Sequence, residues 1–442
     1  MLCSDITELI GGTPLLRLDP DRHRIPGVEL YAKLEFLNPF GSVKDRIAWA
    51  MAGPYLPGIA RRGQMLIEAS SGNTAKALQV LASMHGTRLR ALTNRAKVPE
   101  IRDVLEFLGA DLQELPGLSE CPDPTVPDDV FSVIDRHMAE QQGEFHHASQ
   151  YTNPDNVAAH EATTGREIYD DAGPVDYLFG GLGTTGSTRG AATFLLGKNP
   201  ALQTIGIVST RDDFIPGIRS ESEMWEVGIF ERDFYTDIVP VSSADAIDGT
   251  LELARQHGVL AGPTTGAAYT AARRYLTQAG AAAGRPPLRA VFFACDRLEP
   301  YVSYLRKRRP DLFGHDGAVT GPVAVAPGDG GPEVTVAELA AREPGSSVLC
   351  IDTRGSMAYR AGHIPGSVNI SDDQLEDMLR HGVPFPAGLT VILICPAGEY
   401  SRALAGTLAR AGVDAASLAG GVVAWRDAGL PLEPSPRYSS AT

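Results

Sequence analysis

The chain has 442 residues, of which 43% are hydrophobic and 21% are charged, and its formal net charge at pH 7 is -15. This composition is typical of a globular protein, and the length exceeds that of one ordinary core, so we expect two or three domains. An acidic surface is repelled by the phosphates of nucleic acids and of anionic membranes, which disfavours both as partners. We therefore expect chemistry on small molecules.

The N-terminal segment MLCSDITELIGGTPLL lacks the basic stretch, apolar run and cleavage site of a secretion signal. Nowhere do about eighteen apolar residues follow one another, as a membrane-spanning helix would require. We expect a soluble, cytoplasmic protein. The cysteines form no C-x-x-C pair, which predicts free thiols and no metal site. They are Cys3, Cys121, Cys295, Cys350 and Cys395.

Up to about residue 310, short apolar runs alternate with helical patterns. GQMLIEASSGNT leads into AKALQVLASMHG, and VDYLFGGLGTTG leads into STRGAATFLLGKNP before the run LQTIGIVST. This βαβ rhythm predicts an α/β fold with a mainly parallel sheet, helices on both faces and ligands at the carboxyl ends of the strands.

The rhythm changes twice towards the C-terminus. Residues 311–333 are rich in Gly and Pro without a sustained period, which predicts a linker, part of which can pack against the next domain. The runs VTVAELAAREP, SSVLCIDTRG and LTVILICPAGEYSRALAGTLARAG then predict a smaller α/β domain over residues 334–436. We expect residues 1–310 to form the first domain and residues 437–442 to be a disordered tail.

The stretch NPFGSVKDRIAWAM places Lys44 between a Gly-Ser turn and an Asp-Arg pair at the start of a helical pattern. Taken alone, the stretch is typical of a surface lysine in a capped helix. Three turns rich in Gly and hydroxyl side chains, SSGNT, GLGTTGS and PTTGAA, also stand between a strand and a helix. Each one alone is typical of a helix cap, but each can also bind an anion. A lysine, a phosphate cradle and a carboxylate site together are what a pyridoxal-phosphate enzyme needs.

The motifs KLEFLNPFGSVKDR, SSGNT, SQYTNPDN, GLGTTGS and GVLAGPTTGAA occur in this order. In order and spacing they resemble the cysteine synthase and cystathionine β-synthase family, which are pyridoxal-phosphate enzymes of fold type II, over about residues 5–308. The GLGTTG loop is most similar to that of the cysteine synthases that use O-phosphoserine. The resemblance implies a homodimer that binds pyridoxal 5'-phosphate and an amino-acid substrate.

The resemblance also implies roles for individual residues. Lys44 would form the imine with the cofactor and remove the Cα proton, with a pKa lowered by burial. Asn73 would bind the cofactor's 3'-oxygen, and Thr264, or else its neighbour Thr265, would face the pyridine nitrogen. The substrate carboxylate would be bound by Ser70, Ser71, Thr74 and Gln150. The cofactor phosphate would be bound by Gly183, Thr184, Thr185, Gly186 and Ser187.

The implied reaction is loss of a leaving group from an O-activated L-serine, formation of an α-aminoacrylate and addition of a nucleophile. Arg219, in DFIPGIRSESEMW, stands where the relatives that use O-phosphoserine bind the substrate phosphate, and a guanidinium suits a phosphate dianion. The alternative is a surface arginine in a mobile loop. The IPGI stretch also resembles the enzyme that joins O-phosphoserine to glutamate, so an amine nucleophile, or homocysteine, stays open beside sulfur.

Two departures from the family pattern affect the pocket. Ala75 follows SSGNT at a position where glycine is common in the family. In the stretch FFACDRLEPY, Cys295 and Asp296 occupy a turn that in the family usually has a PDSG-type sequence. Because Cys295 follows the apolar run AVFFA, we interpret it as a buried structural thiol and not as a nucleophile.

In the second domain, Cys395 stands between an apolar strand and a helix, where loop amides stabilise a thiolate. The stretches IDTRGSMAYRAGHIPGSVNI and LAGGVVAWRDAGLPLE on either side resemble a rhodanese domain over about residues 334–434, which implies that Cys395 carries sulfur as a persulfide. Asp352, His363 and Trp425 would be structural. The expected persulfide loop comprises Cys395, Pro396, Ala397, Gly398, Glu399, Tyr400, Ser401 and Arg402.

Glu399 and Tyr400 occupy loop positions where relatives that use thiosulfate often have basic residues. A carboxylate opposes an incoming dianion, so we expect the sulfur donor to be a persulfide or a carrier protein. The preferred hypothesis is that Cys395 supplies sulfur, directly or as sulfide, to a cysteine-forming reaction at Lys44, because fusion raises the effective concentration. In the alternative, the rhodanese domain is a regulatory or docking module.

Overall fold

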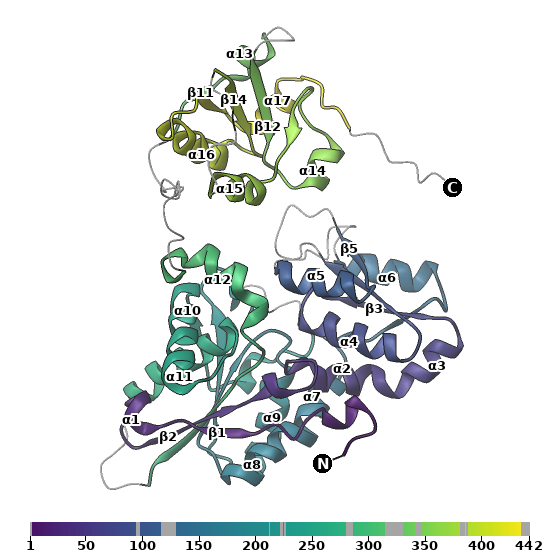
Figure 1. The fold of residues 1–442 in the computed structure, drawn as a ribbon. Helices are drawn as coiled ribbons and strands as arrows, with labels where there is room; N and C mark the ends of the chain where they lie inside the picture. The colour runs from purple at the N-terminus through teal and green to yellow at the C-terminus, as the bar shows by residue number, and fades with distance from the viewer. Residues whose placement is uncertain are drawn as a thin grey trace. The chain divides into compact units, whose positions relative to one another are not determined.

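The computed structural model describes residues 2–93, 98–115, 130–211, 213–221, 224, 227–279, 286–313, 330–341, 347–380, 385 and 388–434. The chain divides into two compact units, Met1–Phe313 and Gly314–Thr442. Both are α/β folds, which confirms the predicted class (Figure 1).

The larger sheet of the first unit has six strands in the order β1-β2-β10-β7-β8-β9. Only β1 pairs antiparallel, at the edge. Residues of β10 alternate between the two faces, as a strand's period of two requires: Ala290 and Phe292 join one core cluster, Val291 and Phe293 another. The strands are β1 (Leu15–Arg17), β2 (Val28–Lys33), β7 (Tyr177–Gly181), β8 (Gln203–Ser209), β9 (Asp237–Val241) and β10 (Leu288–Phe293).

The smaller sheet of this unit has four parallel strands in the order β5-β4-β3-β6. Leu66 and Ile67, which are neighbours on β3, also enter separate core clusters, so this sheet is covered on both faces. The strands are β3 (Met65–Ala69), β4 (Leu89–Thr93), β5 (Asp111–Glu114) and β6 (Phe145–His147).

Helices cover the faces of both sheets, as the βαβ rhythm predicts (Figure 1). Those closest in the chain to the smaller sheet are α2 (Lys44–Ala52), α3 (Leu56–Arg61), α4 (Asn73–Met84), α5 (Pro99–Phe107) and α6 (Val130–Glu140). The others are α1 (Pro20–His23), α7 (Asp155–His160), α8 (Arg166–Ala172), α9 (Gly186–Leu196), α10 (Ser243–Glu252), α11 (Pro263–Ala279) and α12 (Val302–Arg308).

A buried ionic network joins α2 to the larger sheet. Arg46 forms ion pairs of 2.7 Å with both Glu35 and Glu167, and Lys33, which is fully buried on β2, pairs with Glu167 at 2.7 Å. Although burial opposes it, the hydrogen bonds and charge of Arg46, with those of Lys33, lower the pKa of Glu167 to about 2. The network therefore fixes the helix that begins at Lys44.

The second unit is built on a five-stranded parallel sheet in the order β11-β15-β14-β12-β13. Its strands are β11 (Glu333–Val334), β12 (Val348–Asp352), β13 (Val368–Asn369), β14 (Thr390–Ile394) and β15 (Ala415–Leu418). Its helices are α13 (Val336–Ala340), α14 (Ser356–Ala361), α15 (Asp372–Arg380), α16 (Glu399–Arg410) and α17 (Gly421–Asp427).

Three residues expected to be structural make internal contacts in this unit. Buried Asp352 pairs with Arg354 at 2.7 Å, His363 stacks on Tyr359, and Trp425 Nε1 donates to the Pro431 carbonyl at 2.9 Å. Part of the expected linker packs here too, because the backbone N–H of Ser417 donates to the carbonyl of Pro332 at 2.8 Å. Residues 314–329 of that linker, and the expected tail at 437–442, lie outside the described residues.

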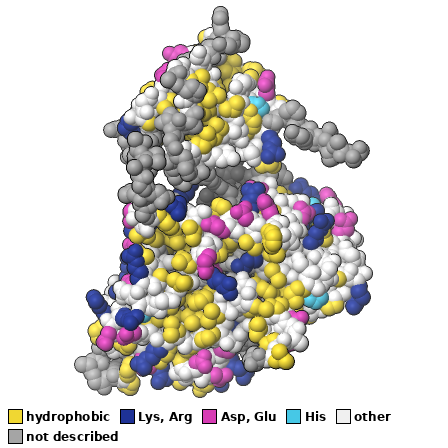
Figure 2. All heavy atoms as spheres, viewed as in Figure 1, with side chains coloured by type: hydrophobic (Ala, Val, Ile, Leu, Met, Phe, Trp, Pro, Cys, Tyr) yellow, Lys and Arg dark blue, Asp and Glu magenta, His cyan; other side chains and the backbone are white. Residues whose placement is uncertain are grey.

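Other sequence expectations concern the surface and the thiols. On the face of the first unit drawn in Figure 2, basic and acidic side chains are interspersed among hydrophobic ones. Among the described residues, no helix is long and apolar enough to cross a membrane, and no cluster of His, Cys, Asp and Glu could hold a metal. Four cysteines are free, as expected, and Cys121 lies outside the described residues.

Candidate active site

Lys44 is the first residue of α2 and its side chain enters a cavity of about 330 Å³ between the two sheets of the first unit. Gly41, with a φ of 91°, turns the chain into the helix, and the Ser42 hydroxyl accepts from the backbone N–H of Lys44 at 3.2 Å. The backbone N–H of Val43 donates to the carbonyl of Cys295 at 2.7 Å, which joins this turn to the end of β10. The position of Lys44 thus depends on both sheets.

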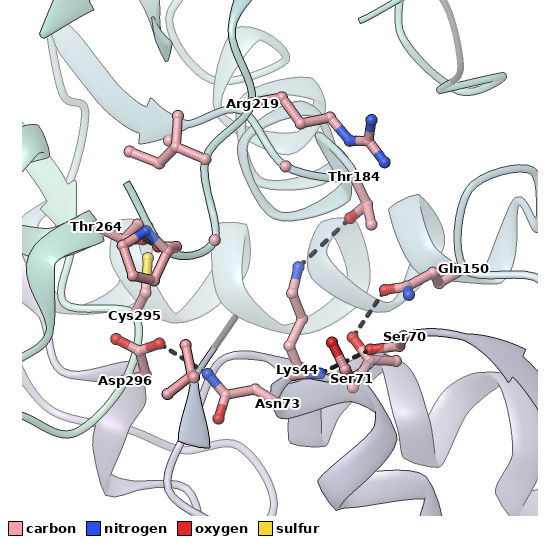
Figure 3. Close-up of a pocket in the computed structure, with 18 of the residues that line it drawn as sticks. Lys44, Ser70, Ser71, Asn73, Gln150, Thr184, Arg219, Thr264, Cys295 and Asp296 are labelled. Atoms are coloured by element: carbon pink, nitrogen blue, oxygen red, sulfur yellow. Dashed lines mark hydrogen bonds between the residues drawn. The ribbon is translucent and has the colours of Figure 1, made fainter. Parts of the chain in front are cut away.

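The surroundings of the Lys44 amine favour its neutral form over the charged one. Burial lowers its pKa, and the nearby Cys295 and Asp296 oppose this effect only in part. Its Nζ donates to the Thr184 hydroxyl at 3.4 Å across the cavity (Figure 3). A neutral amine held in a cavity is suited to act as a nucleophile and as a base.

The SSGNT loop lies on one side of this amine, at the start of α4. The Ser70 hydroxyl accepts from the backbone N–H groups of Gly72 and Ala75, and the Thr74 hydroxyl donates to Gln150 Oε1 at 2.7 Å. Gln150 Nε2 in turn donates to a backbone carbonyl at 3.1 Å, which fixes its orientation. The loop therefore presents hydroxyls, an amide side chain and a helix N-terminus to the cavity, a combination suited to a carboxylate.

The GTTGS loop, between β7 and α9, forms a cradle on the opposite side. A Cβ on Gly183 would lie 2.7 Å from the carbonyl of Gly217, and one on Gly186 would lie 1.9 Å from Asn156 Oδ1, so both positions require glycine. Thr185 adopts a φ of 70°, and its buried hydroxyl makes no hydrogen bond of ordinary geometry. An orphaned hydroxyl at the N-terminus of an eleven-residue helix fits a phosphate.

The third turn places Thr264, and not Thr265, in the cavity wall. The Thr264 hydroxyl donates to the carbonyl of Pro216, whereas the Thr265 hydroxyl accepts from the backbone N–H of Cys295 at 3.0 Å. This arrangement favours Thr264 over its neighbour for the contact with the pyridine nitrogen.

Arg219 extends over the cavity from the side opposite Asn73 (Figure 3). Its backbone N–H donates to the carbonyl of Leu182 at 2.9 Å, and its guanidinium lies over the ring of Tyr151 at 5.1 Å. This stacking holds the side chain where it can contact a ligand in the cavity.

Most of the predicted residues come together in this one cavity, but Gly186 packs behind it. Those that line it are Lys44, Ser70, Ser71, Asn73, Thr74, Gln150, Gly183, Thr184, Thr185, Ser187, Arg219 and Thr264. Tyr151, Asp296 and Tyr301 also line the cavity but were not predicted as site residues. Asp296 was visible in the sequence as a departure from the family turn.

The interpretation of Cys295 as a buried structural thiol is wrong in one respect. Its side chain is only half-buried and lines the cavity beside Lys44, because the strand ends at Phe293 and the chain turns inward. Burial nevertheless raises the pKa of the thiol, so that it stays protonated and is a poor nucleophile.

The candidate site of the second unit surrounds Cys395, between β14 and α16. Its Sγ accepts hydrogen bonds from the backbone N–H of Gly398 at 3.2 Å, the backbone N–H of Ser401 at 3.4 Å and the Ser401 hydroxyl at 3.1 Å. Gly398 has a φ of 89°, and an added Cβ there would lie 2.8 Å from the backbone nitrogen of Gly420. Three donors therefore converge on one sulfur, an arrangement suited to hold a sulfur-bearing group at this position.

The other loop residues differ in exposure and in their contacts. Pro396, Ala397 and Glu399 are exposed. The backbone N–H of Arg402 donates to the Gly398 carbonyl at 3.1 Å, and its side chain pairs with Glu333 at 3.5 Å. Within the expected loop from Cys395 to Arg402, the hydrogen bonds to the sulfur that the structure identifies come from Gly398 and Ser401.

Comparison with known families agrees with both sites. Residues 6–296 match the family of pyridoxal-phosphate dependent enzymes, and residues 335–428 match the rhodanese-like domain. The chain belongs to the family of pyridoxal-phosphate dependent enzymes, and its second unit is a rhodanese-like domain.

Among its relatives are enzymes of cysteine metabolism. Cysteine synthase B of Salmonella typhimurium is 32% identical over 304 residues, which span 67% of this chain and 94% of that protein. The crystal structure of cysteine synthase from Entamoeba histolytica aligns with a TM-score of 0.60 and 25% identity, covering 72% of this chain and 93% of that one. The O-acetylserine dependent cystathionine beta-synthase of Helicobacter pylori aligns with a TM-score of 0.58 and 26% identity, covering 69% and 98%.

The cavity fits the cofactor of the family. It offers a lysine with a lowered pKa, a glycine-lined cradle with an orphaned hydroxyl, and the Thr264 hydroxyl from the third turn. The first two suit the aldehyde and the phosphate of pyridoxal phosphate, and the Thr264 hydroxyl would donate to the ring nitrogen by turning away from the Pro216 carbonyl.

Proposed function

We propose that the protein catalyses β-replacement on an O-activated L-serine, preferably O-phospho-L-serine, to form L-cysteine, and that Cys395 carries the incoming sulfur as a persulfide. The observation that carries the first half is a lysine amine with a lowered pKa in one cavity with two helix N-termini that suit anions. The resemblance to cysteine synthases supports the same reaction.

When bound, pyridoxal phosphate supplies an aldehyde that condenses with amines and a ring that withdraws electrons from Cα. The protein's residues position the substrate and move its proton. Lys44 would hold the cofactor through its aldehyde, and its free amine would accept the Cα proton at Nζ. Thr184, at 3.4 Å from that Nζ, orients it. Ser187 and the Thr185 hydroxyl bind the cofactor phosphate.

The substrate carboxylate binds at the SSGNT loop. Ser70, Ser71 and Thr74 supply hydroxyls, and the Thr74 contact with Gln150 preorganises the pair before the ligand arrives. The α4 helix N-terminus adds a positive partial charge.

Arg219 binds the leaving group in this proposal. A guanidinium forms charge-assisted, paired hydrogen bonds with a phosphate dianion, which an acetyl ester cannot match. The stacking on Tyr151 holds the side chain at the cavity and reduces the entropy lost when it binds.

The proposed role of Cys395 follows from its three hydrogen-bond donors. The outer persulfide sulfur leaves as sulfide when a thiol attacks the inner sulfur and forms a disulfide with Cys395. The sulfide then adds to the β-carbon of the substrate in the Lys44 cavity. Glu399, exposed at the loop, disfavours thiosulfate and leaves a persulfide or a carrier protein as the donor.

The test is a two-step mixing experiment with holoenzyme. O-phospho-L-serine or O-acetyl-L-serine is added first, and the absorbance of the bound cofactor reports loss of the leaving group. Sulfide, homocysteine or an amine is added next, and restoration of the resting spectrum identifies the nucleophile. A spectrum that responds to neither serine ester contradicts the proposal, and restoration by homocysteine alone favours the reaction named for the Helicobacter pylori relative.

The resemblance to cysteine synthases also supports a homodimer acting in the cytoplasm. Light scattering on the full-length holoenzyme tests the first point, with twice the chain mass of 47.0 kDa expected.

A further inference from the structure

Asp296 is a buried carboxylate in the wall of the cavity, with 5% of its surface exposed. It follows the end of β10 and forms an isolated backbone bridge with Ser42, two residues before Lys44. The mechanism above gives it no role, although an ionisable group so close to the reacting lysine affects the chemistry there.

Both hydrogens of the Asn73 side-chain amide are donated within this cluster, one to Asp296 and one to Tyr301. Asn73 Nδ2 donates to Asp296 Oδ2 at 2.7 Å and to the Tyr301 hydroxyl at 3.2 Å, and that hydroxyl itself donates to Asp296 Oδ2. Figure 3 shows the Asn73 nitrogen directed at Asp296. Because an amide nitrogen carries only two hydrogens, none remains for a ligand.

This arrangement conflicts with the role proposed for Asn73. To bind the anionic 3'-oxygen of the cofactor, Asn73 has to donate a hydrogen bond, but in the observed orientation only its acceptor Oδ1 is left. Two acceptors facing each other repel, so an ionised Asp296 competes with the cofactor for the same amide hydrogens.

We propose that Asp296 is a positioning residue whose protonation turns the Asn73 amide toward the cofactor. The ionised carboxylate holds Nδ2. The protonated carboxyl takes one proton from solvent and donates its O–H to Oδ1 of the turned amide, which leaves an N–H for the 3'-oxygen. This inference rests on the proposed contact between Asn73 and the cofactor.

The other oxygen of Asp296 supports the protonation. Oδ1 is buried without a hydrogen-bond partner, and a Cβ added to Gly262 would lie 2.4 Å from it. An unpartnered charged oxygen in the interior is costly, and a proton on the carboxyl removes that cost.

The surroundings of Asp296 bring its pKa into a pH range that an experiment can cover. Burial raises its pKa to about 6, against the Tyr301 hydrogen bond and the positive charges of Lys76 and Lys44, which lower it. The charges of Asp45 and Arg297 act on Lys76 in turn, and the neighbouring Cys295 thiol stays neutral. Of the two lysines, only Lys44 lines the cavity, so the charge of Lys76 can be removed without altering the cavity lining.

The experiment measures the affinity of the apoprotein for pyridoxal phosphate against pH, by its visible absorbance, in the wild type and in Asp296→Asn. The asparagine mimics the protonated carboxyl, because its N–H can always donate to Asn73 Oδ1. The ratio of wild-type to variant Kd is expected to be near one below pH 6 and to rise up to about tenfold per pH unit above it, since one proton must bind with the cofactor. A ratio that does not change with pH overturns the proposal.

Two further variants complete the test. Lys76→Gln removes a charge that favours the ionised carboxylate, so the rise in Kd should begin at higher pH, and an unchanged onset contradicts the proposal even if Asp296→Asn does not fold. Asn73→Ala separates the two hypotheses. If it leaves cofactor affinity and spectrum unchanged, the role of Asn73 is wrong; if it weakens binding while Asp296→Asn keeps the wild-type pH dependence, only the role of Asp296 is wrong.

Discussion

At the scale of single residues, the protonation state of Lys44 follows from its surroundings. An ordinary lysine is charged at neutral pH and can neither attack an aldehyde nor accept a proton. Burial lowers the pKa of this amine, and burial also raises the pKa of Asp296, whose charge opposes that effect, to about 6. The reactivity of Lys44 is therefore a property of the whole cavity wall.

Replacing Lys44 with alanine should abolish the covalent bond to pyridoxal phosphate. We expect the purified variant to lack the visible band of the bound cofactor, and turnover to fall at least about a thousandfold because the base is lost as well. Absorbance after gel filtration measures the first effect. The exposed Lys198→Ala should keep both properties. A yellow Lys44→Ala protein whose band is bleached by borohydride, with the cofactor then fixed covalently to the chain, would require another lysine to be assigned.

Replacing Arg219 with glutamine should change the choice of substrate more than the chemistry. We expect kcat/KM for O-phospho-L-serine to fall about 100-fold, because roughly two charge-assisted hydrogen bonds are lost. We expect kcat/KM for O-acetyl-L-serine to change less than about threefold. Steady-state kinetics with both esters measure the ratio, and the exposed Arg211→Gln is the matched control. Equal losses with both esters would show that Arg219 supports the loop and does not read the leaving group.

At the scale of elements, the helix that carries Lys44 depends on charges far from it in the sequence. Arg46 of α2 meets Glu35, which precedes it by eleven residues, and Glu167 on α8, which follows it by 121. These charges are buried and mutually hydrogen-bonded, so removing one member leaves the others uncompensated.

Glu167→Gln should therefore lower the free energy of unfolding at pH 7 by about 3 kcal/mol, since the variant leaves Lys33 and Arg46 without their shared carboxylate. The sign of the pH dependence follows from the lowered pKa of Glu167, about 2 against an ordinary 4.5. The difference in free energy of unfolding between the wild type and the variant is largest above pH about 4.5, and it disappears as the pH falls towards 2. Urea unfolding of both proteins at several pH values measures it. A difference that stays constant with pH would assign the effect to packing.

These elements also show what the sequence could predict. The runs from Gln64 to Gly86 contained a strand, a hydroxyl-rich turn and a helix, and β3 and α4 occupy those positions, because local periodicity and turn chemistry suffice there. The contact of Asn73 with Tyr301 joins residues 228 positions apart, and no local pattern encodes it. The antiparallel edge strand β1 was also missed, since three residues carry too little period.

At the scale of the whole molecule, two chemistries share one chain. The Cys395 loop offers three donors to a sulfur, and the Lys44 cavity offers the groups that activate a β-carbon. Because both units belong to one chain, they are present in equal amounts, and transfer of a labile sulfur from one to the other is effectively intramolecular. That benefit exists only if sulfur leaves Cys395 for the other site, which separates the proposal from a regulatory role for the rhodanese-like unit.

Replacing Cys395 with alanine should separate sulfur supply from β-replacement. With sulfide as the nucleophile we expect an unchanged rate, because the Lys44 cavity is intact. With a persulfide donor and a thiol we expect cysteine formation to fall at least about tenfold, because the donor sulfur no longer has the Cys395 side chain to which Gly398 and Ser401 donate. Mass spectrometry of the Cys395 peptide should show a persulfide that the thiol discharges, and the released sulfur should appear in cysteine only when O-activated serine is present.

The matched control is Cys350→Ala, which removes a half-buried thiol that forms no disulfide from β12 of the same unit and should leave both rates unchanged. Equal rates for Cys395→Ala and the wild type with the persulfide donor would contradict sulfur transfer through this residue. A persulfide that forms on Cys395 but does not discharge would instead make the second unit a sensor. In that case, the rate of cysteine formation from sulfide should depend on whether Cys395 carries the persulfide. Comparing this rate for protein with and without the persulfide loaded before sulfide is added measures the effect directly.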